Sequence, residues 1–219
     1  MSSSAESLAA RYATRGPRYT SYPTAPNFRD DVDVDALKLC WQEATSPLSL
    51  YLHVPYCQVR CLFCGCHTKI TQNRERGQAY TDDLLTELDG VGRWTDLQRP
   101  LRQLALGGGT PNFLLAEDME RLIRAIESRM SIATDAERSI EVDPRAITPQ
   151  YVRMLVELGF NRFSMGVQDL DDDVMAAVNR PQALATVTEV VHAIRATGDL
   201  PINMDLIYGL PRQSVESWT

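Results

Sequence analysis

Short apolar runs alternate with helical patterns along most of this 219-residue chain, and this alternation most constrains its fold. Runs typical of β-strands lie near residues 49–54, 101–106, 138–142, 162–167 and 202–207. Patterns typical of amphipathic helices lie between them, near 76–97, 116–130, 148–158 and 182–197. Strands that alternate with helices form βαβ units and a parallel sheet. Because no dinucleotide-binding fingerprint accompanies them, the pattern favours an α/β fold with a barrel or partial barrel over a doubly wound sheet.

Four of the strand runs separate apolar from polar side chains, because successive residues of a strand point to opposite faces. The apolar face carries Leu50, Leu52, Val54, Ile140, Val142, Phe163, Met165, Val167, Met204 and Leu206. The opposite face carries Tyr51, His53, Ser139, Glu141, Ser164, Gly166, Gln168, Asn203 and Asp205. In a barrel the outer face packs on helices, and active sites form at the carboxyl ends of the strands. Glu141, Gln168 and Asp205 fall late in their strands, so we expect a ligand-filled lumen there. The alternative is an open sheet with one solvated face, which is rare for parallel sheets.

The regular pattern begins near residue 48 and divides the chain into two parts. Residues 1–47 are expected to form an N-terminal arm and a helix, and residues 48–219 a partial barrel. Cys40 lies on the apolar face of the first helix, which predicts a buried core position for it. The residues from Leu210 on are typical of the start of another helix. We therefore expect the sequence to end before the fold does, after about five strands.

Composition excludes several classes of partner. The formal net charge of −7 argues against nucleic acid, which is bound by clustered Lys and Arg. No apolar stretch is long enough for a membrane span, and the N-terminus lacks the basic start and apolar run of a signal peptide. A cytoplasmic protein is the expectation that follows.

Four of the five cysteines lie within ten residues, in the order Cys57-x3-Cys61-x2-Cys64-x-Cys66. This spacing on one loop is typical of metal binding, and it does not match a secreted disulfide framework. Three thiolates can hold three irons of a four-iron cluster and leave the fourth iron open to a substrate. The alternative is a structural zinc site formed by all four thiols. Structural zinc usually takes two separated pairs of cysteines, and the single residue between Cys64 and Cys66 makes a tetrahedral arrangement awkward.

A glycine-rich loop, Gly107-Gly-Gly-Thr-Pro111, follows the second strand. Glycines let a backbone approach a ligand closely, although three in a row are also common in plain turns. The loop lacks the third glycine of a dinucleotide fingerprint, where Asn112 stands, and the Gly-Lys-Ser/Thr of a P-loop. Its place directly after a strand favours a binding loop.

Together these motifs resemble the radical S-adenosylmethionine (SAM) superfamily. The likeness rests on the cysteine triad, with Phe63 before its last member, and on the glycine-rich loop. Within the superfamily the chain is similar to the oxygen-independent coproporphyrinogen III oxidase family. Three strings carry that similarity in order, namely Pro17–Ala25, Tyr51-x-His53-x-Pro55-x-Cys57 and Cys64-Gly-Cys66.

The resemblance runs from about residue 11 to the end and covers about the N-terminal half of such an enzyme. It therefore implies a radical SAM partial barrel whose remaining strands and C-terminal domain are absent. Two residues depart from the family pattern. His67 stands where Asn is expected, and Pro181 follows Arg180 where an apolar non-proline residue is expected.

The resemblance also implies cofactors and site residues. Cys57, Cys61 and Cys64 would ligate a [4Fe–4S] cluster, with SAM on its fourth iron and a second SAM beside the first. The residues implied for the first SAM are Tyr51, Gly108 and Glu141. Those implied for the second are Phe63, Gly109, Thr110, Gln168, Arg180 and Asp205. The catalytic candidates are Tyr51, His53 and Cys66, of which His53 and Cys66 are also compatible with hydrogen-bonding and packing roles.

The implied reaction converts two propionates of coproporphyrinogen III to vinyl groups through a 5′-deoxyadenosyl radical, giving protoporphyrinogen IX in haem biosynthesis. An electron donor such as a flavodoxin or ferredoxin and a monomeric enzyme are expected with it. The alternatives are a haem-binding chaperone with the same barrel and cluster, and a radical SAM enzyme acting on another substrate.

Overall fold

The computed structural model describes residues 27–31 and 33–218, so the string Pro17–Ala25 lies outside the described residues. The chain divides into two compact units, residues 1–39 and residues 40–219. Helix α2 (Val34–Glu43) spans their boundary and contains no buried residue. The prediction of a buried Cys40 is therefore wrong, because its thiol lies on an exposed helix. No helix in the described ranges is long and apolar enough to span a bilayer.

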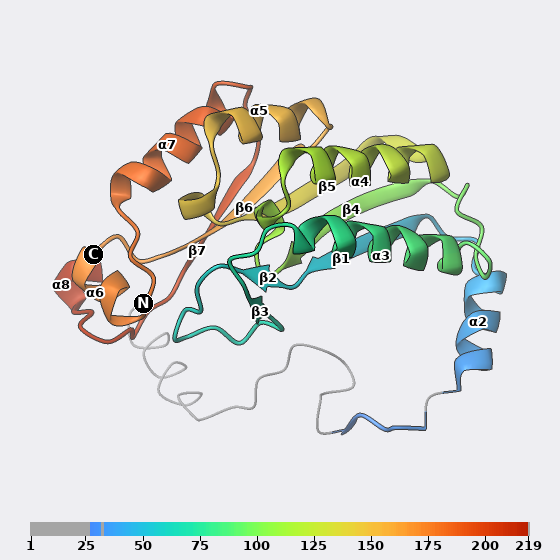
Figure 1. Ribbon diagram of the computed structural model, residues 1–219, viewed down its shortest axis with the longest axis horizontal. Helices are drawn as coiled ribbons and strands as arrows, with labels where there is room; N and C mark the ends of the chain where they lie inside the picture. The colour runs from blue at the N-terminus through green and yellow to red at the C-terminus, as the bar shows by residue number, and fades with distance from the viewer. Residues whose placement is uncertain (1–26, 32, 219) are drawn as a thin grey trace, which may run out of the picture. The chain divides into compact units, whose positions relative to one another are not determined.

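A five-stranded sheet forms the centre of the second unit (Figure 1). Its strands are β1 (Leu48–Val54), β4 (Leu101–Gly108), β5 (Ile132–Val142), β6 (Arg162–Gln168) and β7 (Ile202–Leu206). They pair in that order, and every pair is parallel. A doubly wound sheet would reverse its strand order at a switch point, whereas here spatial order follows chain order throughout. The predicted α/β fold with a partial, barrel-like parallel sheet is confirmed.

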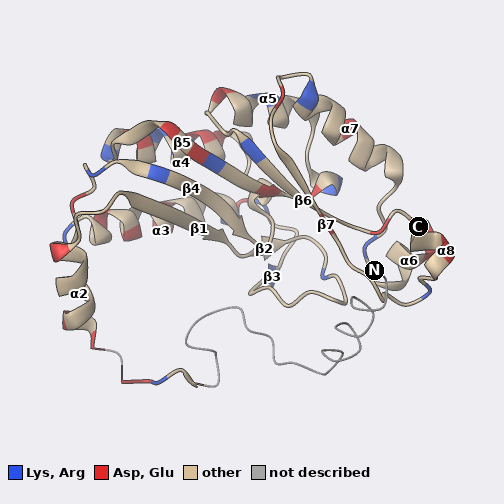
Figure 2. Cartoon of the chain, turned by 180° about the vertical axis from the view of Figure 1, so that it is seen from behind, with Lys and Arg blue, Asp and Glu red and all other residues tan. Residues whose placement is uncertain are grey.

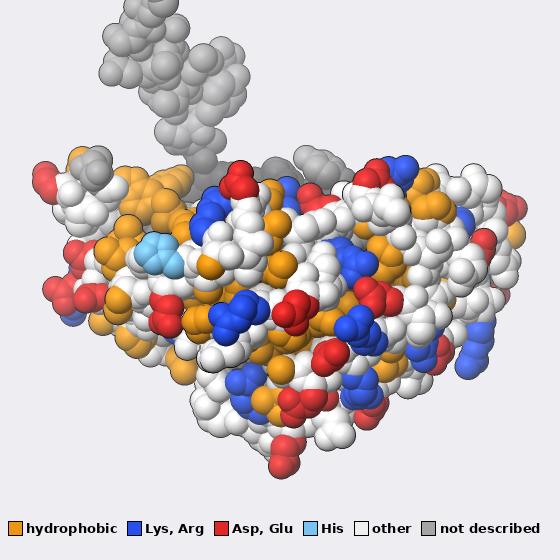
Figure 3. Space-filling view, turned by 90° about the horizontal axis from the view of Figure 1, so that it is seen from above, with side chains coloured by type: hydrophobic (Ala, Val, Ile, Leu, Met, Phe, Trp, Pro, Cys, Tyr) orange, Lys and Arg blue, Asp and Glu red, His pale blue; other side chains and the backbone are white. Residues whose placement is uncertain are grey.

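Long helices cover one face of this sheet (Figure 1). They are α3 (Arg76–Val91), α4 (Ala116–Arg129), α5 (Pro149–Glu157) and α7 (Leu184–Arg195). Their apolar sides pack on the strands in one core that includes Leu104, Ile123, Leu155 and Phe163, all fully buried. Seen from above, the helix-covered side shows acidic and basic side chains interspersed (Figure 3).

Several short elements were not predicted. They do not include α8 (Val215–Trp218), which is the helix expected in the residues from Leu210 on. They are the two-stranded pair β2 (Tyr56–Cys57) and β3 (Lys69–Ile70), the 3₁₀ turns η2 (Pro111–Phe113) and η3 (Pro144–Ala146), and helix α6 (Asp172–Ala177). Each is too short to show a hydrophobic period. Two boundaries also differ, since α3 ends six residues before the predicted residue 97 and β5 begins six residues before 138.

The early part of β5 escaped prediction because it carries charges. Asp135 and Glu137 form ion pairs with arginines of the neighbouring strands, Arg102 at 2.9 Å and Arg162 at 3.2 Å. Figure 2 shows acidic and basic residues on neighbouring strands of the sheet. Such cross-strand pairs stabilise a sheet without any apolar alternation in the sequence.

The predicted division of the faces is confirmed in β1, β5 and β6. Val54, Ile140 and Met165 are buried under the helices, whereas Tyr51 and Glu141 are exposed on the other face. The prediction is wrong for β7, where Met204 and Leu206 are 43% and 55% exposed. This strand lies at the sheet edge and pairs with β6 alone, and no helix of the described residues covers its apolar side.

Replacing Leu104 by Ala should lower the free energy of unfolding by about 2–5 kcal/mol, because the side chain is fully buried in a strand paired on both sides. Chemical denaturation would measure the change. Leu184→Ala is the matched control, since its side chain is 54% exposed and its loss should change stability by less than about 0.5 kcal/mol. Equal losses in both variants would contradict the placement of the core.

Candidate functional site at the carboxyl ends of the strands

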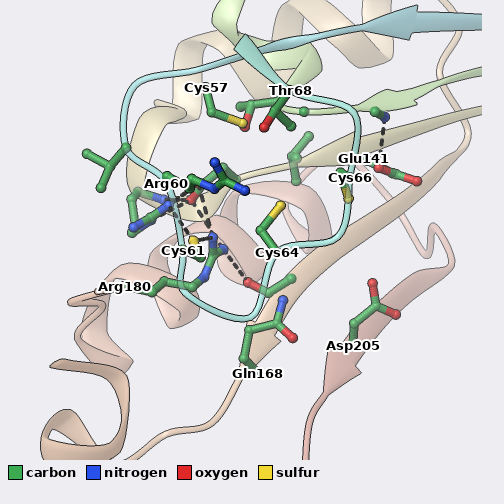
Figure 4. A pocket seen from close by; sticks show the side chains of 18 of the residues that line it. Cys57, Arg60, Cys61, Cys64, Cys66, Thr68, Glu141, Gln168, Arg180 and Asp205 are labelled. Carbon is green, nitrogen blue, oxygen red and sulfur yellow. Dashed lines mark hydrogen bonds and ion pairs between the residues drawn. The ribbon is translucent and has the colours of Figure 1, made fainter. Parts of the chain in front are cut away.

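A cavity lies where the carboxyl ends of the strands meet the cysteine loop (Figure 4). It holds about 780 Å³ of free space, part of it open to solvent. All the predicted site residues line it except Tyr51 and His53. The sequence argument that polar residues late in parallel strands would face one site is thus confirmed for Glu141, Gln168 and Asp205.

The short pair β2 and β3 closes the base of the cysteine loop. The amide of Lys69 donates to the carbonyl of Pro55 at 2.7 Å, and that of Thr71 donates to Cys57 at 3.0 Å. The tip of the loop is tied to the end of α6, where the amide of Leu62 donates to Val178 at 3.0 Å. The loop is therefore held at both ends before any ligand binds.

Cysteine thiols reach the cavity at different depths. Cys61 is buried, Cys57 and Cys64 are half-buried, Cys66 is exposed, and all four are free thiols. Although Cys66 is exposed as a residue, its thiol is partly withdrawn from water. This partial burial, together with the neighbouring Cys64, raises the pKa of Cys66 to about 11. Burial also raises the pKa of Cys57, against a hydrogen bond from Thr110 at 3.3 Å. A bound cation would be needed to hold such thiols as thiolates at neutral pH.

The thiols of the cysteine loop are a donor set that fits an iron–sulfur cluster. Cys57, Cys61 and Cys64 come from one loop and line one cavity. A four-iron cluster binds each thiolate through a different iron, so three thiols can hold it and leave the fourth iron open. Among the described residues, no three His, Cys, Asp or Glu side chains converge closely enough to hold a single metal ion.

The glycine-rich loop packs against the protein itself. A Cβ at Gly107 would lie 2.9 Å from the Glu141 carboxyl group, and one at Gly108 would lie 2.6 Å from the His53 ring. Gly108 also has a φ of +114°, which favours glycine. Its amide donates to Glu141 at 3.3 Å, and burial raises the pKa of that carboxyl group. The glycines thus bring the strand ends of β1, β4 and β5 into contact.

Tyr51 and His53 lie in an adjoining groove along β1 and α3. The His53 Nε2 lies 2.9 Å from the carbonyl oxygen of His67, and a carbonyl can only accept, so Nε2 carries the hydrogen. The other nitrogen, Nδ1, then accepts from the Tyr51 hydroxyl at 3.2 Å. Burial and the charges of Glu141 and Cys66 raise the pKa of Tyr51, which keeps its hydroxyl protonated beside the cavity.

Arg180 is buried and already has hydrogen-bond partners within the protein. Its side chain is buried and donates to the carbonyl of Gly166 at 2.6 Å, to Asp143 at 3.3 Å and to Cys61 Sγ at 3.6 Å. Only its Nε has no partner. Gln168 is also buried, with a φ of +71°, whereas Asp205 is exposed and accepts from Asn203 at 2.8 Å.

Two residues of this site were missed in the sequence. Asp143 and Arg145 line the cavity and form an ion pair at 2.6 Å. The signal that could have found them is their position, since the string Asp-Pro-Arg directly follows a predicted strand whose last residues face the lumen.

Comparison with known proteins agrees with this geometry. Residues 51–219 match the Radical SAM superfamily. Two curated relatives are oxygen-independent coproporphyrinogen III oxidases, 40% identical in Pseudomonas aeruginosa and 41% in Synechocystis sp., each over 96% of this chain. The chain spans about half the length of these relatives, 47% and 46%.

A solved structure shows the same fold. Coproporphyrinogen III oxidase from Escherichia coli, a radical SAM enzyme, aligns with a TM-score of 0.88 and 38% identity, covering 96% of this chain and 47% of that one. The predicted radical SAM type of partial barrel is confirmed by this match. The matching family, together with the cavity that gathers four cysteines and the polar strand ends, establishes that the chain belongs to the radical SAM superfamily.

Proposed function

We propose that this chain provides the cluster and SAM site of an oxygen-independent coproporphyrinogen III oxidase. The observation that carries the proposal is the single cavity in which the cysteine loop, the glycine-rich loop and the ends of β5, β6 and β7 meet. Family membership implies SAM and a [4Fe–4S] cluster as cofactors. The likeness to oxidases of about 40% identity supports coproporphyrinogen III as the substrate.

Cys57, Cys61 and Cys64 are the ligands that we propose for the cluster, and Cys66 is a neighbour. When bound, the reduced cluster would supply one electron for the cleavage of SAM, and SAM would supply the 5′-deoxyadenosyl group that takes a hydrogen atom from the substrate. In the overall reaction each propionate would pass one hydrogen atom to that group and one electron to an electron acceptor, release carbon dioxide and become a vinyl group. Because this chemistry would form a radical in the cavity, the protein must orient the propionate and exclude water.

The strand ends supply the groups that orient SAM. Glu141 accepts hydrogen bonds, and its carboxylate suits an ammonium group or ribose hydroxyls. With Tyr51 and Gly108 it would contact the first SAM. The residues proposed for a second SAM are Phe63, Gly109, Thr110, Gln168, Arg180 and Asp205. Within the Arg180 side chain, the buried Nε is the nitrogen without a hydrogen-bond partner in the protein.

Tyr51 and His53 have a proton-handling role in this proposal. The Tyr51 hydroxyl donates to His53, and His53 in turn donates to the backbone of His67. This chain of hydrogen bonds fixes the tautomer of His53 and leaves the Tyr51 oxygen free to accept. A flavodoxin or ferredoxin as electron donor, a monomeric enzyme and a cytoplasmic location complete the proposal.

Replacing Cys57, Cys61 or Cys64 singly by Ser should abolish cluster assembly, because a four-iron cluster depends on all three thiolates. Cys66→Ser is the matched control on the same loop and should retain the cluster. Anaerobic reconstitution with iron and sulfide, followed by iron and sulfide analysis, measures the outcome. Loss of the cluster in Cys66→Ser, or its retention in all three other variants, would refute the ligand set.

The reconstituted protein should cleave SAM and decarboxylate coproporphyrinogen III when a reductant is supplied. Mass spectrometry of the porphyrin products and of 5′-deoxyadenosine measures both reactions. SAM cleavage with no decarboxylation would argue against the oxidase and for another radical SAM reaction. Stable haem binding without decarboxylation would instead favour a haem chaperone.

Gly108→Ala should weaken SAM binding at least about tenfold, or about 1.4 kcal/mol, because the new Cβ displaces His53 from beside Glu141. The strained φ should also cost about 1–3 kcal/mol of stability. Gly90→Ala serves as the control, since nothing lies within 4 Å of its Cβ position. It should keep wild-type SAM affinity in equilibrium binding, and equal affinities in both variants would contradict the proposed role of Gly108.

A further inference from the structure

Two guanidinium groups lie beside the sulfur of Cys61. Arg180 Nη1 is 3.6 Å from this sulfur and Arg145 Nη2 is 4.0 Å from it. In the part of the chain that the structure describes, neither Cys57 nor Cys64 has an arginine at hydrogen-bonding distance. The thiol of Cys57 has the neutral hydroxyl of Thr110 as its partner instead. One of the three proposed ligands is thus placed in a distinctly positive environment.

The carboxylate of Asp143, whose side chain is 12% exposed, holds both arginines in place. Asp143 Oδ2 lies 2.6 Å from Arg145 Nη2 and 3.3 Å from Arg180 Nη1, and Arg145 Nε donates to the same carboxyl group at 2.9 Å. Burial alone would raise the pKa of Asp143, but the hydrogen bonds and charges of the two arginines lower it below its usual value. The group is therefore ionised, and two cations against one anion leave a net positive charge beside Cys61.

The backbone around Asp143 is fixed as well. Asn112 is buried, accepts from the Asp143 amide at 2.9 Å and donates to its carbonyl at 3.2 Å. This pair of bonds joins the turn after the glycine-rich loop to the end of β5. Asp143, the common partner of the two arginines, is thus held between this turn and the end of β5. The arginines are therefore kept in place beside Cys61.

We propose that Arg145 is a positioning residue that, through Cys61, raises the reduction potential of the bound cluster. The proposal rests on the cluster assignment made above. Reduction adds negative charge to the cluster, and a nearby cation that hydrogen-bonds a ligand sulfur stabilises this charge. Figure 4 shows Arg180 and Cys61 facing one another at the wall of the cavity. Arg145 is the sharper probe, because Arg180 is also proposed to contact SAM.

The test is a redox titration of the reconstituted protein, followed by the electron paramagnetic resonance signal of the reduced cluster. At the wild-type midpoint potential, Arg145→Gln should give a reduced-to-oxidised ratio about tenfold lower, which is a shift of about 59 mV to more negative values. Arg145→Lys keeps the charge and should shift the midpoint by less than half as much.

Arg102→Gln is the matched control. It also breaks an arginine–aspartate pair, with Asp135, but near the amino end of β4, and should leave the midpoint unchanged. Asp143→Asn removes the balancing anion and should move the midpoint in the positive direction. If Arg145 and Asp143 had only a structural role, their variants would assemble fewer clusters. The clusters that do assemble would then keep the wild-type midpoint potential.

The outcomes separate this inference from the proposed function. A wild-type midpoint in Arg145→Gln, with iron and sulfide content intact, overturns the inference and leaves the cluster assignment standing. Failure of the wild-type protein to assemble a cluster overturns the assignment itself. If Arg145→Gln does not assemble a cluster, Asp143→Asn decides, and an unchanged midpoint in that variant overturns the inference.

Discussion

The hydrogen bonding between β1 and β4 continues past the end of β4, and the arrangement of the site depends on it. His53 and Val54 lie in register with Gly107 and Gly108, and the next amide, that of Gly109, donates to the carbonyl of Val54 at 2.8 Å. This bond places the glycine-rich loop against the first residues of the cysteine loop. A Cβ at Gly109 would lie 2.9 Å from the backbone of Pro55, which cannot withdraw as a side chain can. The two loops therefore meet only because glycine stands at this position.

The same register explains why residues far apart in sequence share one cavity. All the parallel strands end at the same edge of the sheet. The residue that follows each strand therefore lies close to the loops that follow the neighbouring strands. The Glu141 carboxyl group accepts a hydrogen bond from the Gly108 amide. Asp143, two residues further on, donates through its amide to Asn112 in the turn after the glycine-rich loop. The cavity is thus a consequence of strand direction, and its chemistry follows from which residue stands at each strand end.

Strand positions and the division of their faces could be predicted from the sequence because burial under helices imposes a two-residue period. Glu141 and Gln168 were placed correctly on that basis, while Met204 and Leu206 were not, since β7 has no covering helix in the described residues. The first half of β5 and the pair β2–β3 could not be predicted, because ion pairs and loop hydrogen bonds leave no apolar pattern. The role of Arg145 at Cys61 was hidden for another reason, since their contact joins residues 84 positions apart.

The buried charges at Asp143 show how stability and site chemistry are coupled. A carboxylate taken out of water costs several kcal/mol unless it is paired, and two guanidinium groups compensate it here. Each arginine also lies near a sulfur, so any change that loosens the ion pairs alters the charge around Cys61. Replacing the network by apolar residues of similar volume would be tolerable for folding. It would, however, also remove the positive charge that the two arginines place beside the Cys61 sulfur, so the residues that stabilise this part of the fold also set the electrostatics of the cavity.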